Sequence, residues 1–316
     1  MELYNAYISL YAIDKNIEKG LKSKFSKLKF KSYQETINEK NADLKSDAII
    51  VWPNSVVNKK VLDKMPKLKA IFAASTGTNN IDLDECTKRA IIVKNCPTYS
   101  SNAVAEMAIT LAFSGLRKIE IANRYARELN YAQNKREIFA GGELSGKTCA
   151  ILGTGNIGAL IAKKLICLGC NVLAYSRSEN EELVKSGVKY GTLAQILPKT
   201  DIVFIALPAN RETFHLVNDK VFAIVKKNVG VVNIARGEII DSRALYEALP
   251  NISFAALDVI EDEPIIWIHK RPRKVIEKLA KHDKVLLLPH IGASTIEAQE
   301  NLKKELIKNI EEFLSM

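Results

Sequence analysis

Three side chains that could act together in catalysis each follow an apolar segment in the second half of the chain. Arg236, Glu263 and His290 supply a cation, a carboxylate and an imidazole, in that order. The preceding apolar segments are predicted to be buried strands and cover residues 229–234, 252–257 and 285–288. Ligands of open parallel sheets bind at the carboxyl ends of the strands, so one shared site is expected. There an arginine can clamp a carboxylate, a histidine can exchange a proton, and a glutamate can hold the imidazole.

A glycine-rich fingerprint precedes these three residues and indicates a dinucleotide site. Gly153, Gly155 and Gly158 match G-x-G-x-x-G between a predicted strand at 148–152 and a predicted helix at 157–168. The first glycine permits the tight turn, the second lets a pyrophosphate approach, and the third lets the helix pack on the strand. The phosphates then lie on free N–H groups at the helix N-terminus. Together with the three candidate catalytic residues, this makes a redox enzyme the first hypothesis.

The segment after the next strand bears on which dinucleotide binds. An NAD site needs an acid about 20 positions further on, which accepts a hydrogen bond from the ribose 2′-hydroxyl. Here the predicted strand 171–175 ends in Ser176-Arg177-Ser178, and the first acid is Glu179. An arginine between two hydroxyls can hold a 2′-phosphate through charge-assisted hydrogen bonds, which favours NADP(H). The alternative is an arginine in a surface turn, with NAD(H) as the cofactor.

Length and composition are those of an ordinary globular protein with two domains. The chain has 316 residues, of which 47% are apolar and 26% charged, without a signature of disorder. The net charge of +10 prompts the hypothesis of a nucleic-acid partner, and Lys19–Lys31 is the most basic stretch. Its lysines are interleaved with apolar residues, and other basic residues are spread along the chain. We therefore expect an anionic small molecule and no nucleic-acid partner.

Cysteine content and hydropathy favour a cytoplasmic location. The five cysteines are an odd number without a framework spacing, which suits a reducing compartment. Cys167 and Cys170 form a C-x-x-C without a second pair, so two buried structural residues and no metal site are expected. No apolar run reaches the roughly 18 residues of a membrane span, so no membrane partner is expected. The segment Met1–Tyr7 lacks the features of a signal peptide.

Predicted strands and helices alternate along the chain, which is typical of parallel sheets covered by helices on both faces. A single long helix is predicted over 102–130, because its apolar residues recur at helical spacing. An amphipathic helix at about 296–313 ends the chain and is expected to pack on the first domain. Further strands are predicted at residues 47–52, 68–74, 91–95, 171–175 and 202–207.

These elements predict two doubly wound α/β domains. A smaller, flavodoxin-like substrate domain is expected at residues 1–98, completed by the C-terminal helix at 293–316. A Rossmann dinucleotide-binding domain is expected at 99–292, which contains the fingerprint and all three candidate catalytic residues.

Over nearly its whole length the chain resembles the D-isomer-specific 2-hydroxyacid dehydrogenases. The resemblance includes the fingerprint and an ordered set of motifs on both sides of it. These motifs lie at residues 75–82, 99–106, 143–147, 206–208, 233–241, 257–264 and 288–294. The set is specific for the family and much less so for a substrate.

By this resemblance, Arg236 would bind the carboxylate and carbonyl oxygen of the substrate. His290 would protonate the carbonyl oxygen while hydride arrives at carbon. Glu263 would pair with His290 and keep it protonated near neutral pH, with Glu261 and Asp262 as rival partners. His215, His269 and His282 are expected to be surface residues.

The resemblance also implies contacts to both ligands. Backbone N–H groups of Thr76 and Gly77 would complete a cradle for the substrate carboxylate. Asp258 would receive the nicotinamide amide, and Ile234 and Ala235 would line the nicotinamide. Other cofactor contacts are expected in the matching motifs, at Asn156, Ile157, Leu207, Pro208 and Gly292.

The motifs favour a small 2-keto acid as substrate. Trp52 and Tyr99 could be walls for its side chain, or packing residues. The Ser-Arg-Ser turn is similar to that of glyoxylate and hydroxypyruvate reductases that use NADPH. Tyr99 is similar to a residue of D-lactate dehydrogenases, and Gly77-Thr-Asn79 resembles D-3-phosphoglycerate dehydrogenases, although Pro53-Asn-Ser55 replaces their arginines.

A function of another class also fits the chain. A regulator or corepressor that senses the dinucleotide would keep the same fold and bind cofactor tightly with negligible turnover. In either case the resemblance implies a homodimer built on the dinucleotide domain.

Overall fold

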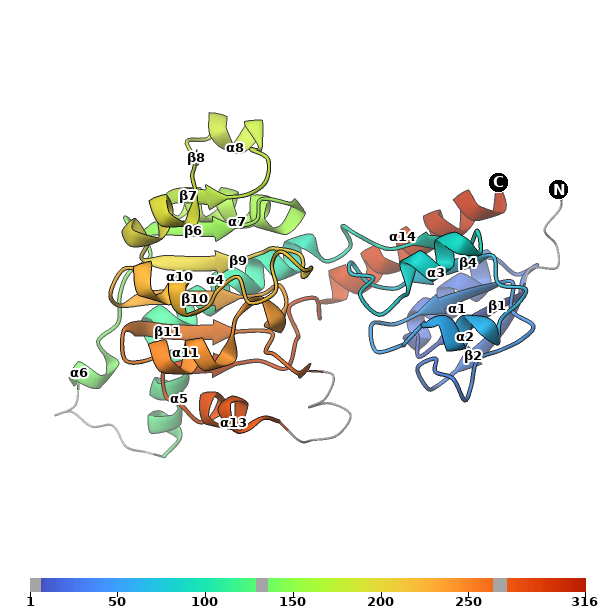
Figure 1. The fold of residues 1–316 in the computed structure, drawn as a ribbon, viewed down its shortest axis with the longest axis horizontal. Helices are drawn as coiled ribbons and strands as arrows, with labels where there is room; N and C mark the ends of the chain where they lie inside the picture. Colours follow the sequence, from blue (N-terminus) through green and yellow to red (C-terminus); the bar gives the residue numbers. More distant parts are fainter. Residues whose placement is uncertain (1–6, 129–135, 264–271) are drawn as a thin grey trace. The chain divides into compact units, whose positions relative to one another are not determined.

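The computed structural model describes residues 7–128, 136–263 and 272–316 and divides the chain into two compact units. Unit 1 is Met1–Ser100 with Ser294–Met316, and unit 2 is Ser101–Ala293. Each unit is a parallel sheet with helices on both faces (Figure 1), which confirms the predicted fold class. No helix in the three described ranges is long and apolar enough to cross a membrane.

Unit 1 contains a five-stranded parallel sheet in the flavodoxin-like order β2-β1-β3-β4-β5. In β3, Ala48 and Ile50 belong to one apolar cluster and Ile49 and Val51 to the other, so both faces are buried. Helices α1 and α14 cover the first face, and α2 and α3 cover the second. The elements are β1 (Tyr7–Tyr11), α1 (Lys15–Lys24), β2 (Lys29–Tyr33), β3 (Ala48–Val51), α2 (Lys59–Asp63), β4 (Ala70–Ala73), α3 (Leu83–Lys88), β5 (Ile92–Lys94) and α14 (Ile296–Leu314).

Unit 2 contains a seven-stranded parallel sheet in the order β12-β11-β10-β9-β6-β7-β8. Helices α4 and α7 cover one face, and α9, α10, α11 and α13 cover the other. The strands are β6 (Thr148–Leu152), β7 (Asn171–Tyr175), β8 (Lys189–Tyr190), β9 (Ile202–Ile205), β10 (Val229–Asn233), β11 (Ile252–Leu257) and β12 (Val285–Leu287). The helices are α4 (Ser101–Arg117), α5 (Ile119–Arg127), α6 (Arg136–Phe139), α7 (Asn156–Cys167), α8 (Glu181–Lys185), α9 (Leu193–Ile196), α10 (Asp219–Ile224), α11 (Ser242–Ala248) and α13 (Lys274–Ala280).

The order of strands in unit 2 fixes where a ligand can bind. Strand β6 pairs in parallel with β7 on one side and with β9 on the other, so successive strands extend the sheet in opposite directions from β6. In parallel sheets this switch point leaves a crevice at the carboxyl ends of the strands, which is where dinucleotides bind. The glycine fingerprint directly follows β6.

The single helix predicted over 102–130 is wrong. Lys118 adopts a left-handed conformation, with φ of 52°, and separates α4 from α5. The buried small and branched residues of α4 stop at Ala112, whereas the residues of α5 are all partly or fully exposed. The core therefore fixes only the first of the two helices, and helical spacing alone does not reveal the break.

The basic stretch Lys19–Lys31 includes the start of β2, an edge strand of its sheet whose lysines are exposed. One further expectation differs from the structure. Of the C-x-x-C pair, Cys170 is buried but Cys167 is exposed at the end of α7, and both are free thiols. His269 lies outside the described residues.

Candidate active site

A pocket of about 470 Å³ lies at the carboxyl ends of β6, β7 and β9. Seven of the residues predicted to bind cofactor line it. They are Gly153, Gly155, Ser176, Arg177, Ser178, Leu207 and Pro208. The predicted contacts at Asn156, Ile157, Gly158, Ile234, Ala235, Asp258 and Gly292 belong to the same unit but do not line this pocket.

The glycine fingerprint has the space that a dinucleotide needs. Gly153 has φ of 96°, a conformation that favours glycine. A Cβ atom at Gly158 would lie 1.9 Å from the carbonyl oxygen of Gly153. The start of α7 therefore packs so closely on the turn that only glycine fits at position 158. At Gly155, the residue before α7, a Cβ atom would meet no heavy atom within 4 Å. This open space in front of the helix N-terminus fits a phosphate group.

Part of the pocket wall, the segment after β9, was not predicted from the sequence. Asn210 Oδ1 accepts hydrogen bonds from the N–H groups of Glu212 at 2.9 Å and Thr213 at 3.0 Å. The Thr213 hydroxyl in turn donates to Pro208 O at 2.6 Å. An Asn three residues before a Thr is a signal for such a turn. The pocket residues missed from sequence are Thr154, Tyr175, Glu179, Asn180, Ala206, Asn210, Glu212, Thr213 and Leu216.

Glu263 and His290 form a hydrogen-bonded pair in unit 2. His290 Nδ1 lies 2.9 Å from Glu263 Oε2, and the other carboxylate oxygen accepts from Ile260 N–H at 2.9 Å. The Glu263 side chain is 14% exposed and the His290 side chain 33%. A carboxylate on Nδ1 fixes both the orientation of the ring and the nitrogen, Nε2, that exchanges a proton with a ligand.

Asp258 shapes the segment that carries His290. Its two carboxylate oxygens accept from Ile291 N–H at 2.8 Å and Gly292 N–H at 2.9 Å, and its carbonyl accepts from His290 N–H at 2.9 Å. His290 itself has φ of 56°, an unusual conformation for a residue other than glycine. The buried Asp258 thus holds the backbone turn that presents the imidazole.

The turn that carries Arg236 packs directly on the loop that leads to Glu263. Asn233 forms the turn, because its amide donates to Arg236 O at 2.9 Å and its Oδ1 accepts from Ala235 N–H at 3.0 Å. A Cβ atom at Gly237 would lie 2.0 Å from the carbonyl carbon of Ile260. The two backbones can approach this closely only with glycine there. Arg236 Nη1 donates to Ala235 O at 2.7 Å, and the side chain is partly exposed.

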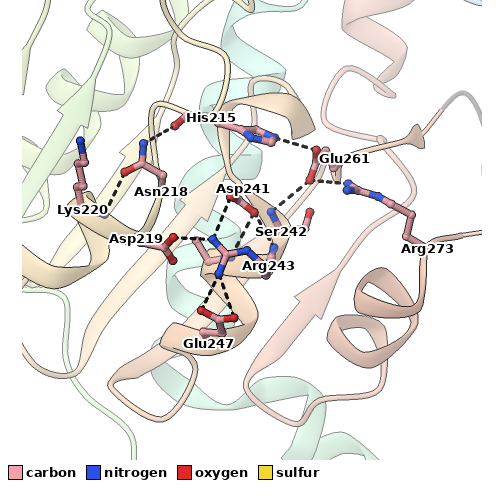
Figure 2. A network of polar contacts seen from close by, with 11 residues as sticks. His215, Asn218, Asp219, Lys220, Asp241, Ser242, Arg243, Glu247, Glu261 and Arg273 are labelled. Carbon is pink, nitrogen blue, oxygen red and sulfur yellow. Dashed lines mark hydrogen bonds and ion pairs between the residues drawn. The ribbon is translucent and has the colours of Figure 1, made fainter.

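Glu261, a predicted rival partner of His290, has different partners (Figure 2). Its carboxylate lies 2.8 Å from His215 Nε2 and 2.7 Å from Arg273 Nη2, and it accepts from Ser242 N–H at 3.2 Å. Burial raises the pKa of Glu261, but hydrogen bonds from these three residues outweigh burial and hold the pKa below its usual value. His215, predicted to be a surface residue, is partly buried, with 29% of its side chain exposed. The cluster joins the segment after β9, the start of α11 and the loop of Glu263.

Glu261→Gln is expected to lower the free energy of unfolding at neutral pH by about 2–3 kcal/mol, because it places an amide among hydrogen-bond donors. A depressed pKa in the folded state gives stability that is present above the unfolded value and lost as the pH falls. The difference from wild type should therefore shrink below the ordinary glutamate pKa of 4.5. Urea unfolding of both proteins above and below that pH measures this difference in the free energy of unfolding. Glu247→Gln, on an exposed ion pair with Arg243, is the control, and an equal loss in both variants would contradict the assignment.

The residues of unit 1 that are predicted to contact the substrate lie after the strands β3, β4 and β5. Thr76 and Gly77 lie three and four residues after the end of β4, and Trp52 directly follows β3. Thr76 Oγ1 donates to Cys96 O at 3.3 Å, and the Ser75 hydroxyl donates to Gly77 O at 2.7 Å. Trp52 and Tyr99 both pack partly buried against the cluster between the sheet and α14. These contacts give both aromatic residues a packing role in unit 1.

The fold and pocket of unit 2, with its Glu–His pair, define a dinucleotide-binding oxidoreductase. The chain belongs to the D-isomer specific 2-hydroxyacid dehydrogenase family, because residues 109–292 match the model of its NAD binding domain. It is 34% identical over 273 residues to the glyoxylate reductase of Pyrococcus horikoshii, with 84% of this chain and 78% of that protein covered. Both findings confirm the resemblance seen in the sequence.

Two other relatives show how far the similarity extends. The chain is 37% identical over 270 residues to the D-3-phosphoglycerate dehydrogenase of Bacillus subtilis, which covers 84% of this chain but 49% of that protein. Among solved structures, the D-lactate dehydrogenase from Aquifex aeolicus, complexed with NAD and lactic acid, has a TM-score of 0.89 at 28% identity. That comparison covers 98% of this chain and 95% of the other. The protein is thus an oxidoreductase of a family that acts on 2-hydroxy acids and has an NAD-binding domain.

Proposed function

We propose that the protein reduces a small 2-keto acid of the glyoxylate or hydroxypyruvate kind to the D-2-hydroxy acid, with NADPH as cofactor. The observation that carries this proposal is the Glu263–His290 pair at 2.9 Å, with the loop that leads to Glu263 packed against the turn of Arg236. Those three side chains supply an anion clamp and a proton donor within the same unit as the dinucleotide pocket.

Each residue of the set has a distinct role in the proposal. When bound in the pocket of unit 2, the dinucleotide supplies the hydride. Arg236 binds the carboxylate and the keto oxygen of the substrate through its planar fork. His290 gives the proton on Nε2 to that oxygen, because Nδ1 is held by Glu263. Glu263 stabilises the imidazolium before the transfer and keeps the ring oriented after it.

Two features support a small, unphosphorylated substrate. Three relatives that align with this chain over most of their own length are named glyoxylate reductases. The loop after β3 has the sequence Pro53-Asn-Ser55, which offers no arginine for a substrate phosphate.

The test is an assay of NADPH and NADH oxidation with glyoxylate, hydroxypyruvate, pyruvate and 3-phosphohydroxypyruvate at saturating concentrations. Turnover with NADPH and one of the first two acids supports the proposal, and chiral analysis of the hydroxypyruvate product should find the D-isomer. Efficient turnover with only the phosphorylated acid or pyruvate would reassign the substrate. Tight NADPH binding without turnover of any acid would favour a dinucleotide-sensing regulator.

The NADPH preference rests on the loop after β7. Ser176, Arg177 and Ser178 line the pocket, and Arg177 is exposed, so its guanidinium can reach a 2′-phosphate. Two carboxylates, Glu179 and Glu212, line the same pocket. They can accept hydrogen bonds from ribose hydroxyls and would repel a phosphate, so NAD(H) is the second candidate cofactor.

Arg177→Ala is expected to weaken NADPH binding by about 10–100-fold and NADH binding by less than about twofold, because one charge-assisted phosphate contact is lost. Dissociation constants from titration of protein fluorescence measure both values. Arg211→Ala removes the same charge from the segment after β9 without changing a pocket-lining residue, so it should leave both affinities nearly unchanged. Equal losses of NADPH and NADH affinity in Arg177→Ala would remove the argument for a 2′-phosphate site.

A further inference from the structure

The loop that lines the pocket after β7 is held at both of its ends. At its start, Gly153 N–H of the fingerprint donates to Tyr175 O at 2.7 Å. At its end, Asn180 N–H donates to the hydroxyl of Tyr190 at 3.0 Å. Ser176, Arg177 and Ser178 lie between these two points, so their positions depend on both attachments.

The Tyr190 hydroxyl makes a second hydrogen bond, to the fingerprint itself. It donates to Thr154 Oγ1 at 3.1 Å, and Thr154 is a buried residue between Gly153 and Gly155. A phenol oxygen can donate one hydrogen bond and accept another at the same time. This one group therefore connects the phosphate-binding turn after β6 with the far end of the loop after β7. Both segments line the same pocket.

The backbone and the ring of Tyr190 are held in place by the fold, which restricts the position of its hydroxyl. Tyr190 lies in β8 and pairs with Ala174 of β7, and Gly191 N–H donates to Ala174 O at 3.0 Å. Its ring packs partly buried against the cluster that includes Leu183 and Val188. A side chain held in this way can orient a neighbouring loop at little entropic cost.

We propose that Tyr190 is a positioning residue that sets the discrimination between NADPH and NADH. It does so by joining Asn180 to Thr154, which holds Ser176, Arg177 and Ser178 where they can surround a 2′-phosphate. The inference rests on the proposed use of NADPH by this pocket. Hydrogen bonds to a phosphate are directional, so they require the loop to be held in one conformation. If the loop has to be ordered when the ligand binds, the protein loses affinity for a ligand with a 2′-phosphate and not for one without it.

Tyr190→Phe removes both hydrogen bonds and keeps the ring. Because two ordinary hydrogen bonds are lost, the dissociation constant for NADPH should rise by roughly tenfold. The dissociation constant for NADH should rise by less than about twofold. Isothermal titration with 2′,5′-ADP and with ADP tests the same contrast without turnover. Only the ligand with the 2′-phosphate should lose affinity.

Two further variants separate positioning from a general loss of structure. Tyr246→Phe makes the same chemical change in unit 2, at a ring that lies under Lys278, and should leave all four affinities unchanged. Thr154→Val removes one of the two hydrogen bonds and should weaken 2′,5′-ADP by a few-fold. The double variant Tyr190→Phe/Thr154→Val should be no weaker than Tyr190→Phe alone, because both remove the same link.

The results distinguish this inference from the cofactor proposal. A wild-type protein that binds 2′,5′-ADP no better than ADP would overturn the NADPH proposal and the inference with it. A wild-type protein that prefers 2′,5′-ADP, with the same preference in Tyr190→Phe, would overturn the inference alone. A parallel loss for ADP and 2′,5′-ADP would also overturn it, since Tyr190 would then support the whole pocket.

Discussion

His290→Gln is expected to lower kcat for 2-keto acid reduction by about 10²–10⁴-fold, the usual contribution of a general acid. Glutamine can still receive or donate a hydrogen bond beside Glu263, so the loop should keep its shape. It cannot give up a proton at neutral pH. The affinity for the dinucleotide should therefore stay within about twofold of wild type, because His290 does not line the cofactor pocket. Steady-state kinetics and a separate cofactor titration measure the two quantities.

His282→Gln is the matched control for this prediction. His282 is also in unit 2, where its Nδ1 accepts from Lys284 N–H at 3.1 Å in the turn before β12. The same replacement there should change kcat by less than about twofold, since no proton transfer is assigned to it. A His290→Gln enzyme with near-normal kcat, or one that has lost dinucleotide binding, would show that His290 is not a simple proton donor.

The parts of this molecule that the sequence predicts well depend on local patterns. Strands β7 and β11 have the predicted bounds, because each is a short apolar run between turn residues. The fingerprint could be recognised because a tight turn, a phosphate cradle and close helix packing each require glycine at one position. Arg236, Glu263 and His290 could be put forward as candidates for a related reason, since each follows the end of a strand in a parallel sheet.

Other features depend on contacts between distant residues and could not be predicted in this way. The partners of Glu261 are set by loop geometry, because three consecutive acids offer no local signal that Glu261 meets His215 and Arg273. The choice of Glu263 as the partner of His290 came from the family resemblance and not from a local pattern. Tyr190 lies outside every element predicted from the sequence, and only the fold brings its hydroxyl to Thr154 and Asn180. Lys118 has no sequence signal for its left-handed conformation, because lysine rarely adopts it.

Arg236→Lys is expected to lower kcat/KM for the keto acid by about 10²–10³-fold, although the positive charge is kept. The planar guanidinium can bond a carboxylate and a keto oxygen at once, whereas an ammonium group is a point charge with a different reach. The lysine would also lack the N–H group that holds Ala235 O at 2.7 Å, a bond that orients the arginine within its own turn. Much of the loss should appear in kcat, because the keto oxygen gains charge in the transition state and the fork then binds it more strongly.

Arg243→Lys provides the comparison within the same unit. Arg243 lies on α11 in exposed ion pairs with Asp219 and Glu247, so the change there should alter kcat/KM by less than about twofold. Steady-state kinetics of wild type and both variants, at saturating cofactor, measure kcat and KM for the keto acid. If Arg236→Lys raised KM and left kcat unchanged, Arg236 would bind substrate and transition state equally well, through the carboxylate alone. A near-normal kcat/KM would mean that another cation holds the substrate, and the proposed clamp would then be wrong.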